Sequence, residues 1–341
     1  MTIKYKYIDN LVNKINGSKT QHKKYLIDIL RYKDGNRYLN DKFYLCQRIE
    51  DGLRRQDTDP KYSRWLEGKM NQLLKEKEER NLSAILGEVR ALGFLYDIFD
   101  NSITPRGGKG CDFTVDYNGK PILIEVNTPL GATKDTNMEH ENVKQNNIQM
   151  QVSEIAPMGF PKRHRDNFQG EAISKLAGIK DTETQFKAKA TNILWIDLLD
   201  PHAWKLNNWK DQCEPFLIWN STITWGAIWH SIYGKKGDKI YDRLETQCQS
   251  DKAYVMEFGG KFQKKSLVDF AIITMPNCTV IFENYKRKQK DKELYQHLFN
   301  CSFLDLYRSW VNFPTKDLRI RVCITRRTGK KYSTKFDSRK Y

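Results

Sequence analysis

The chain lacks the patterns that mark membrane, secreted and zinc-binding proteins. It has no run of 18 apolar residues, and Met1–Asn10 holds no apolar segment of the signal-peptide kind. Its seven cysteines are odd in number and never in Cys-x-x-Cys spacing, and its six histidines form no HxH or HExxH pattern. We therefore expect free thiols in a reducing compartment, a cytoplasmic location and no contact with a membrane.

Negative charge is also in deficit. The 42 Asp and Glu residues face 58 Lys and Arg residues, which leaves a formal charge of +16. Such an excess favours a polyanion, because each neutralised phosphate releases counterions, and we expect a double-stranded nucleic acid as the partner. A basic hairpin is expected over Leu318–Phe336. It carries four candidate DNA contacts, Arg326, Arg327, Lys330 and Lys331. A homodimer or a partner protein stays open.

A hairpin with two carboxylates is the most informative pattern that is present. Asn118-Gly119 separates two apolar segments, 110–115 and 121–127, and predicts a tight turn between antiparallel strands. Glu125 and Asn127 are two positions apart, so they leave the same face of the strand, where Asp112 meets them from its neighbour. Two carboxylates and an amide oxygen suit Mg²⁺. The competing interpretation is an ordinary polar face of a hairpin.

A third carboxylate lies upstream, in a helix that apolar spacing predicts over about Leu82–Phe99. This helix contains Glu88. A helical glutamate, then Asp-Phe, then a strand ending in Glu-x-Lys is the order found in PD-(D/E)XK nucleases. The chain resembles that family through Glu88, Asp112-Phe113 and Glu125-Val126-Asn127. It departs from the family at Asn127, where a lysine is usual.

The resemblance implies an α/β fold with a restriction-endonuclease-like core, in which helices flank a mixed central sheet. It implies a Mg²⁺-dependent DNA endonuclease of the kind found in restriction systems or mobile elements, with Mn²⁺ able to substitute. Asp112 and Glu125 would hold the metal, Glu88 would assist them, and Asn127 would orient water or bind the ion.

Several basic residues are candidates for phosphate contact or for the missing lysine. Arg106 and Lys109 lie in the glycine-rich segment before Asp112, and Lys134 follows the strand of Glu125. The family often carries a Gln or Lys on the helix after the Glu-x-Lys strand. We expect that helix over Gly170–Ala190, with three such residues, Gln185, Lys187 and Lys189.

The chain divides by pattern into three regions. Residues 1–80 read as a helical region, 81–290 as the nuclease-like domain, and 291–341 as a helix followed by the basic hairpin. Helices are expected at 25–30, 43–53, 62–80 and 294–310, and further strands at 103–106, 192–199, 267–275 and 279–285.

Two other functions stay open. One is a non-catalytic nucleic-acid-binding protein on the same fold. The other is a ligase, because Glu125-Val126-Asn127-Thr128-Pro129 also resembles the metal-binding strand of ATP-grasp enzymes. That strand is normally near the end of an ATP-grasp chain, whereas about 210 residues follow it here, so we rank the ligase last.

Overall fold

The fold is that of a computed structural model. It describes residues 5–31, 44–108, 110–129, 176–180, 182, 184–199, 213, 215–218, 222–240, 254–275, 278–287 and 291–301. The chain forms two compact units, each made of separate stretches. Unit 1 consists of Met1–Leu130, Asp181–Pro201 and Leu267–Leu306, and unit 2 of Gly131–Lys180, His202–Ser266 and Tyr307–Tyr341.

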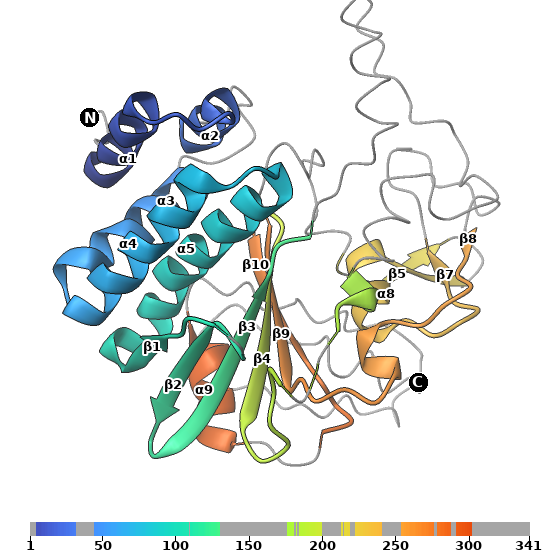
Figure 1. Ribbon diagram of the computed structural model, residues 1–341. Coiled ribbons are helices and arrows are strands. Elements are labelled where there is room, and N and C mark those ends of the chain that lie inside the picture. The colour runs from blue at the N-terminus through green and yellow to red at the C-terminus, as the bar shows by residue number, and fades with distance from the viewer. Residues whose placement is uncertain are drawn as a thin grey trace, which may run out of the picture. The chain divides into compact units, whose positions relative to one another are not determined.

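Unit 1 combines helices with a sheet (Figure 1). Its helices are α1 (Lys6–Gly17), α2 (Lys23–Leu30), α3 (Tyr44–Arg54), α4 (Pro60–Lys75), α5 (Glu79–Phe99) and α9 (Lys292–Asn300), with 3-10 turns η1 (Arg55–Asp57) and η2 (Asp100–Ser102). Its strands are β1 (Ile103–Pro105), β2 (Phe113–Tyr117), β3 (Lys120–Asn127), β4 (Thr191–Asp197), β9 (Phe270–Met275) and β10 (Cys278–Glu283).

The sheet of unit 1 is mixed. Within the described residues it has six strands in the order β1-β2-β3-β4-β9-β10. The pairs β3–β4 and β4–β9 are parallel, and the other neighbours are antiparallel. A mixed sheet with helices packed on it confirms the α/β class expected from the sequence.

The predicted hairpin is confirmed. Strand β2 pairs with β3 in antiparallel register from Phe113↔Ile124 to Tyr117↔Lys120. Between them, Asn118 and Gly119 have φ of 54° and 75°. Two consecutive left-handed residues make the turn whose twist matches that of the strands, which is why Asn-Gly is favoured there.

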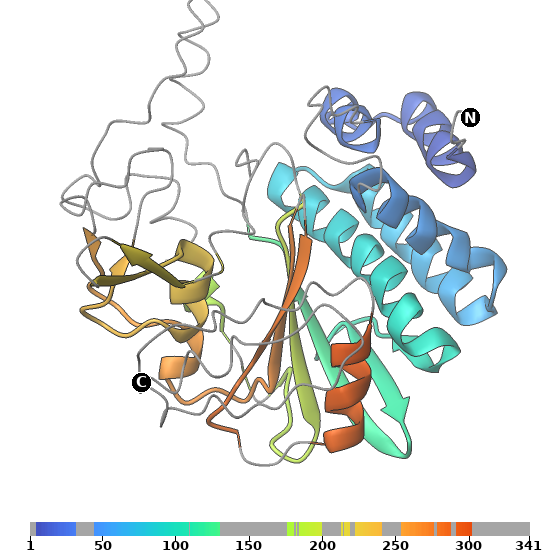
Figure 2. The ribbon, with the colours of Figure 1, turned by 180° about the vertical axis from the view of Figure 1, so that it is seen from behind.

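Helix α5 covers one face of the sheet. Its apolar residues pack with alternate residues of the strands, among them Ile124, Ile193 and Phe270, in a single buried cluster. Phe94 of α5 lies 5.5 Å from Trp195 of β4, centroid to centroid. Helices α3 and α4 pack beside α5, and α9 covers the same face (Figures 1 and 2). The helices upstream of α5 therefore share its core.

Most predicted elements of unit 1 are present, with shifts of a few residues at their ends. The helix expected over 62–80 is two elements, because α4 stops at Lys75 and α5 begins at Glu79. The helix expected over 294–310 ends at Asn300, and the residues after 301 lie outside the described ones. The helix expected over Gly170–Ala190 is wrong in part, because residues 184–190 form turns.

Unit 2 contains helix α8 (Ala227–Tyr233) and η6 (Lys261–Gln263). Its sheet has the order β5-β6-β7-β8, formed by Pro215–Ile218, Thr222–Trp225, Lys239–Ile240 and Tyr254–Val255. Trp229 of α8 is fully buried, as expected for a core residue.

The expectation of free thiols is met at four cysteines of the described residues. Cys46, Cys111, Cys213 and Cys301 are free thiols. Across the part of the chain that the structure describes, no helix has the length and apolar character needed to cross a membrane.

Candidate active site

The three candidate carboxylates come from three different elements of unit 1. Glu88 lies in α5, Asp112 directly precedes β2, and Glu125 is on β3. Asp112 and Glu125 are at the open end of the hairpin, away from the Asn118-Gly119 turn, because Phe113 pairs with Ile124 there. The Oδ2 atom of Asp112 accepts a hydrogen bond of 2.8 Å from the backbone N–H of Val126, which ties the two strand ends together.

Gly87 lets α5 approach the sheet at this end. A Cβ atom on Gly87 would lie 2.0 Å from Oγ1 of Thr128 and 3.0 Å from Oδ2 of Asp197. One turn along, Arg90 donates to Oδ2 of Asp197 at 2.7 Å, and each side chain is only 1% exposed. Close packing at Gly87 and this buried ion pair place Glu88 beside the hairpin's open end.

The three carboxyl groups influence one another electrostatically. The pKa of Glu125 is raised to about 8, first by burial and then by the charge of Asp112. The pKa of Glu88 is raised to about 7 for the same two reasons, with Lys69 opposing the shift. Burial also raises the pKa of Asp112, against the Val126 hydrogen bond and Lys69. A site of this kind favours a bound proton or cation.

Gln185 holds one oxygen of Glu125. Its side-chain Nε2 donates a hydrogen bond of 2.6 Å to Oε1 of Glu125. The other oxygen, Oε2, is buried and makes no hydrogen bond within the described residues. The resemblance implies a Gln or Lys on a helix after the strand of Glu125. Gln185 fills that place in the structure, but it lies in a turn and not in a helix.

The donor atoms suit a hard divalent cation. Asp112 and Glu125 bring carboxylates, half-buried Asn127 ends the same strand, and the unpaired Oε2 of Glu125 leaves one oxygen free for a ligand. The described residues contain no preformed group of three His, Cys, Asp or Glu side chains able to hold a metal ion.

Lys69 of α4 is the site residue that the sequence did not indicate. Its ammonium group forms an ion pair with Oε2 of Glu88. Helix α4 begins at Pro60 after Asp59, whose side chain accepts the Lys61 N–H at 2.7 Å. That cap is visible in the sequence. No spacing relates Lys69 to a glutamate 19 residues later in another helix, so only the packing of α4 on α5 shows the contact.

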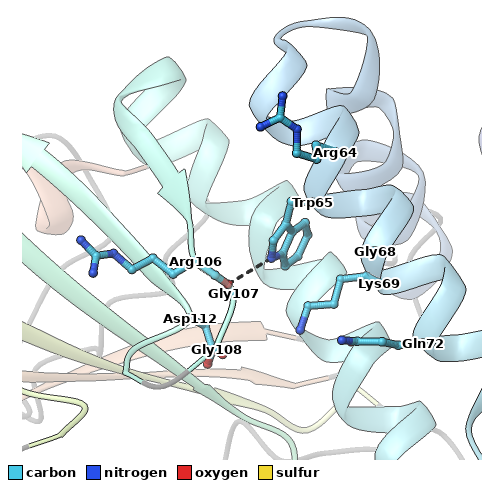
Figure 3. Close-up of a pocket in the computed structure, with 9 residues that line it drawn as sticks. All are labelled: Arg64, Trp65, Gly68, Lys69, Gln72, Arg106, Gly107, Gly108 and Asp112. Carbon is cyan, nitrogen blue, oxygen red and sulfur yellow. Dashed lines mark hydrogen bonds between the residues drawn. The ribbon is translucent and has the colours of Figure 1, made fainter.

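A pocket of about 280 Å³ opens beside Asp112 (Figure 3). Its lining comes from α4 and from the segment between β1 and β2, and consists of Arg64, Trp65, Gly68, Lys69, Gln72, Arg106, Gly107, Gly108 and Asp112. The indole Nε1 of Trp65 donates to the carbonyl of Arg106 at 3.3 Å, which fixes the segment against the helix.

The predicted basic residues are described only in part. Arg106 follows β1 and is exposed, its backbone N–H donates to the carbonyl of Asp112 at 2.7 Å, and its guanidinium points away from Lys69 (Figure 3). Outside the described residues lie Lys109, Lys134, Arg326, Arg327, Lys330 and Lys331.

No protein-family model matches this chain, and neither does any curated protein or solved structure. A function for it therefore has to be inferred from the residues of the site.

Proposed function

We propose that this chain is a metal-dependent endonuclease that hydrolyses phosphodiester bonds in DNA, on a restriction-endonuclease-like core. The observation that carries the proposal is the meeting of Glu88, Asp112 and Glu125 beside one end of the sheet. They come from a helix, the start of one strand and the end of the next, and the charge of Asp112 raises the pKa of both glutamates. The order in the chain is that of the PD-(D/E)XK nucleases it resembles.

The strand arrangement gives further support. Helix α5 is followed along the chain by β1, β2, β3 and then β4, which is the order of strands that the resemblance implies. The resemblance also implies a helix before β4, where residues 176–178 are helical and residues 184–190 are not.

Asp112 and Glu125 would hold Mg²⁺, or Mn²⁺ in its place, together with the amide oxygen of Asn127. The ion would lower the pKa of a bound water and neutralise charge on the phosphate. Gln185 fixes the Glu125 carboxylate by donating to Oε1. The backbone N–H of Val126 fixes Asp112 in the same way. Both carboxylates are therefore oriented before any ligand arrives.

A nucleic-acid substrate is proposed because of charge, and DNA in particular because of the resemblance. The +16 formal charge of the chain favours a polyanion, and the restriction or mobile-element setting is part of the same proposal. Arg106 and the basic residues near the C-terminus are the residues proposed to contact phosphates.

Cleavage of supercoiled plasmid with Mg²⁺ or Mn²⁺ tests the proposal. We expect nicking by the wild-type chain. Asp112→Ala and Glu125→Ala should not nick the plasmid, because each variant loses a charged ligand of the metal ion. Both should still bind DNA in Ca²⁺. Lys75→Met, on the exposed end of α4, serves as the matched control. Cleavage that survives both alanine variants would show that the site is elsewhere.

The same assay addresses the other candidate on this fold. Asn127 stands where a lysine is usual, which favours a non-catalytic DNA-binding protein as the second candidate. No cleavage by the wild-type chain with either metal, together with cleavage by Asn127→Lys, would establish that function.

A further inference from the structure

We infer that Lys69 of α4 is a catalytic residue of this site, where its ammonium group binds the phosphate at which the DNA strand is cut. The inference rests on the proposed function and gives a role to a helix that the sequence places in a separate N-terminal region.

Lys69 is directed at the carboxylates. It pairs with Glu88, and its charge opposes the rise in pKa of both Glu88 and Asp112. Its side chain is only 16% exposed. A lysine held this far from water needs a partner of opposite charge, and Glu88 holds it at the site in the free protein.

The ammonium group also borders open space. Lys69 and Asp112 line the same pocket of about 280 Å³, so the cation and the proposed metal ligand both reach a molecule placed there. In Figure 3 the ammonium of Lys69 and the side-chain amide of Gln72 both point across the pocket toward Gly107, Gly108 and Asp112. Trp65 flanks the lysine, with Nζ 5.4 Å from its ring centroid.

These groups match the chemistry of a phosphodiester. Helix α4 offers N–H donors from Lys69 and Gln72, and the hairpin offers carboxylates for a metal on the other side. The end of β3, Glu125-Val126-Asn127, carries no cation, because the lysine of this strand, Lys120, is at its other end and pairs with Asp291. Of the cations that line the pocket, Lys69 and Arg64 belong to α4, and the guanidinium of Arg106 points away from Lys69 (Figure 3).

In the proposed reaction Lys69 stabilises negative charge and transfers no proton. The oxygen of a water molecule bonds to phosphorus, and the P–O bond to a deoxyribose oxygen breaks. The attacking water releases its proton to solvent, and the departing oxygen takes a proton from water. Negative charge is spread over the non-bridging oxygens during the step, and a fixed ammonium stabilises it most strongly at that point.

Cleavage kinetics of Lys69→Met test the role in catalysis. Removing one transition-state donor lowers kcat by about 10²–10³-fold in well-studied enzymes, and we expect a loss of that order. Lys69→Arg should retain part of the rate, and Lys75→Met, on the same helix, all of it. Cleavage by Lys69→Met at the wild-type rate would overturn the inference and leave the nuclease proposal intact.

The salt dependence of DNA binding shows whether Lys69 contacts a phosphate or only forms an ion pair with Glu88. In Ca²⁺ and in a Glu88→Gln background, Lys69→Met should reduce the slope of log K against log salt by about 0.9, the contribution of one phosphate. An unchanged slope would show that Lys69 acts only through Glu88, and would overturn the inference.

This measurement needs no cleavage. If the wild-type chain cuts no DNA, the proposed function fails, and the slope still decides whether Lys69 binds phosphate. Lys75→Met, measured in the same background, should keep the full slope.

Discussion

The side chain of Glu125 is held where its charge is disfavoured. It is half-buried, it lies near two other carboxyl groups, and Gln185 satisfies only one of its oxygens. Stability alone would favour a neutral residue at this position. Such conflicts between local stability and residue choice are typical of functional sites.

A stability measurement across pH tests this view of Glu125. Its pKa rises from 4.5 to about 8 on folding, so between these values the folded chain binds more protons than the unfolded chain. Stability therefore falls as pH rises through this window. In EDTA, Glu125→Gln should have a higher Tm than the wild type at pH 8 and a similar Tm near pH 4.5, because glutamine cannot ionise.

The exposed Glu67 of α4 offers a control for that comparison. Glu67→Gln removes a carboxyl group in the same way from a position outside the site, and so measures the effect of the substitution itself. Parallel Tm curves for Glu125→Gln and the wild type would contradict the raised pKa.

Helix α5 is the element on which the site depends. It supplies Glu88, packs on β3 and β4, and joins β4 through the buried pair of Arg90 and Asp197. It approaches the sheet closely at Gly87, one residue before Glu88. A small shift of this helix would move Glu88 and its partner Lys69 relative to the hairpin.

Replacing Gly87 with alanine tests the importance of that approach. The new Cβ would stand 2.0 Å from Oγ1 of Thr128, so the Thr128 side chain must rotate, or α5 or the residues just after β3 must move. We expect a loss of about 1–3 kcal/mol in the free energy of unfolding, as for other overpacked sites, with loss of cleavage. Urea denaturation and the plasmid assay measure the two effects.

Gly68→Ala in α4 is the matched control. No atom lies within 4 Å of the Cβ position at Gly68. Alanine there should stabilise the helix by up to about 1 kcal/mol. Equal stability of Gly87→Ala and the wild type would show that the helix has room to move without cost.

At the scale of the whole molecule, the excess of positive charge is the dominant property. Basic residues occur along the whole given sequence, and many of them lie near its C-terminus. Charge of this kind sets affinity and association rate without reading bases.

The salt response of DNA binding tests the role of this charge. If about six phosphates are contacted, affinity should fall roughly a thousandfold between 50 and 200 mM salt. Deletion of Arg326–Tyr341 should make the response shallower and weaken binding to every sequence about equally. Fluorescence anisotropy with unrelated duplexes measures both. A flat salt response, or a loss confined to one duplex, would contradict the prediction.

The sequence by itself determined the local elements and half of the site. The span of α5, the β2–β3 hairpin and its turn followed from apolar spacing and from Asn118-Gly119, which act over a few residues. The pairing of Asp112 with Glu125 followed as well, because a hairpin of known register brings its open ends together. Gln185 was one of three residues expected on a helix after this hairpin, and it contacts Glu125 from the observed turn.

Tertiary structure alone decided the rest. Lys69 meets Glu88 because α4 packs on α5, and β9 lies beside β4 although unit 2 contributes residues 202–266 between them. The predicted boundaries follow the chain in order, whereas each compact unit gathers separate stretches. Contacts between distant segments depend on how the faces of helices and sheet pack against one another, as α5 does at Gly87. No short pattern in a sequence predicts that packing.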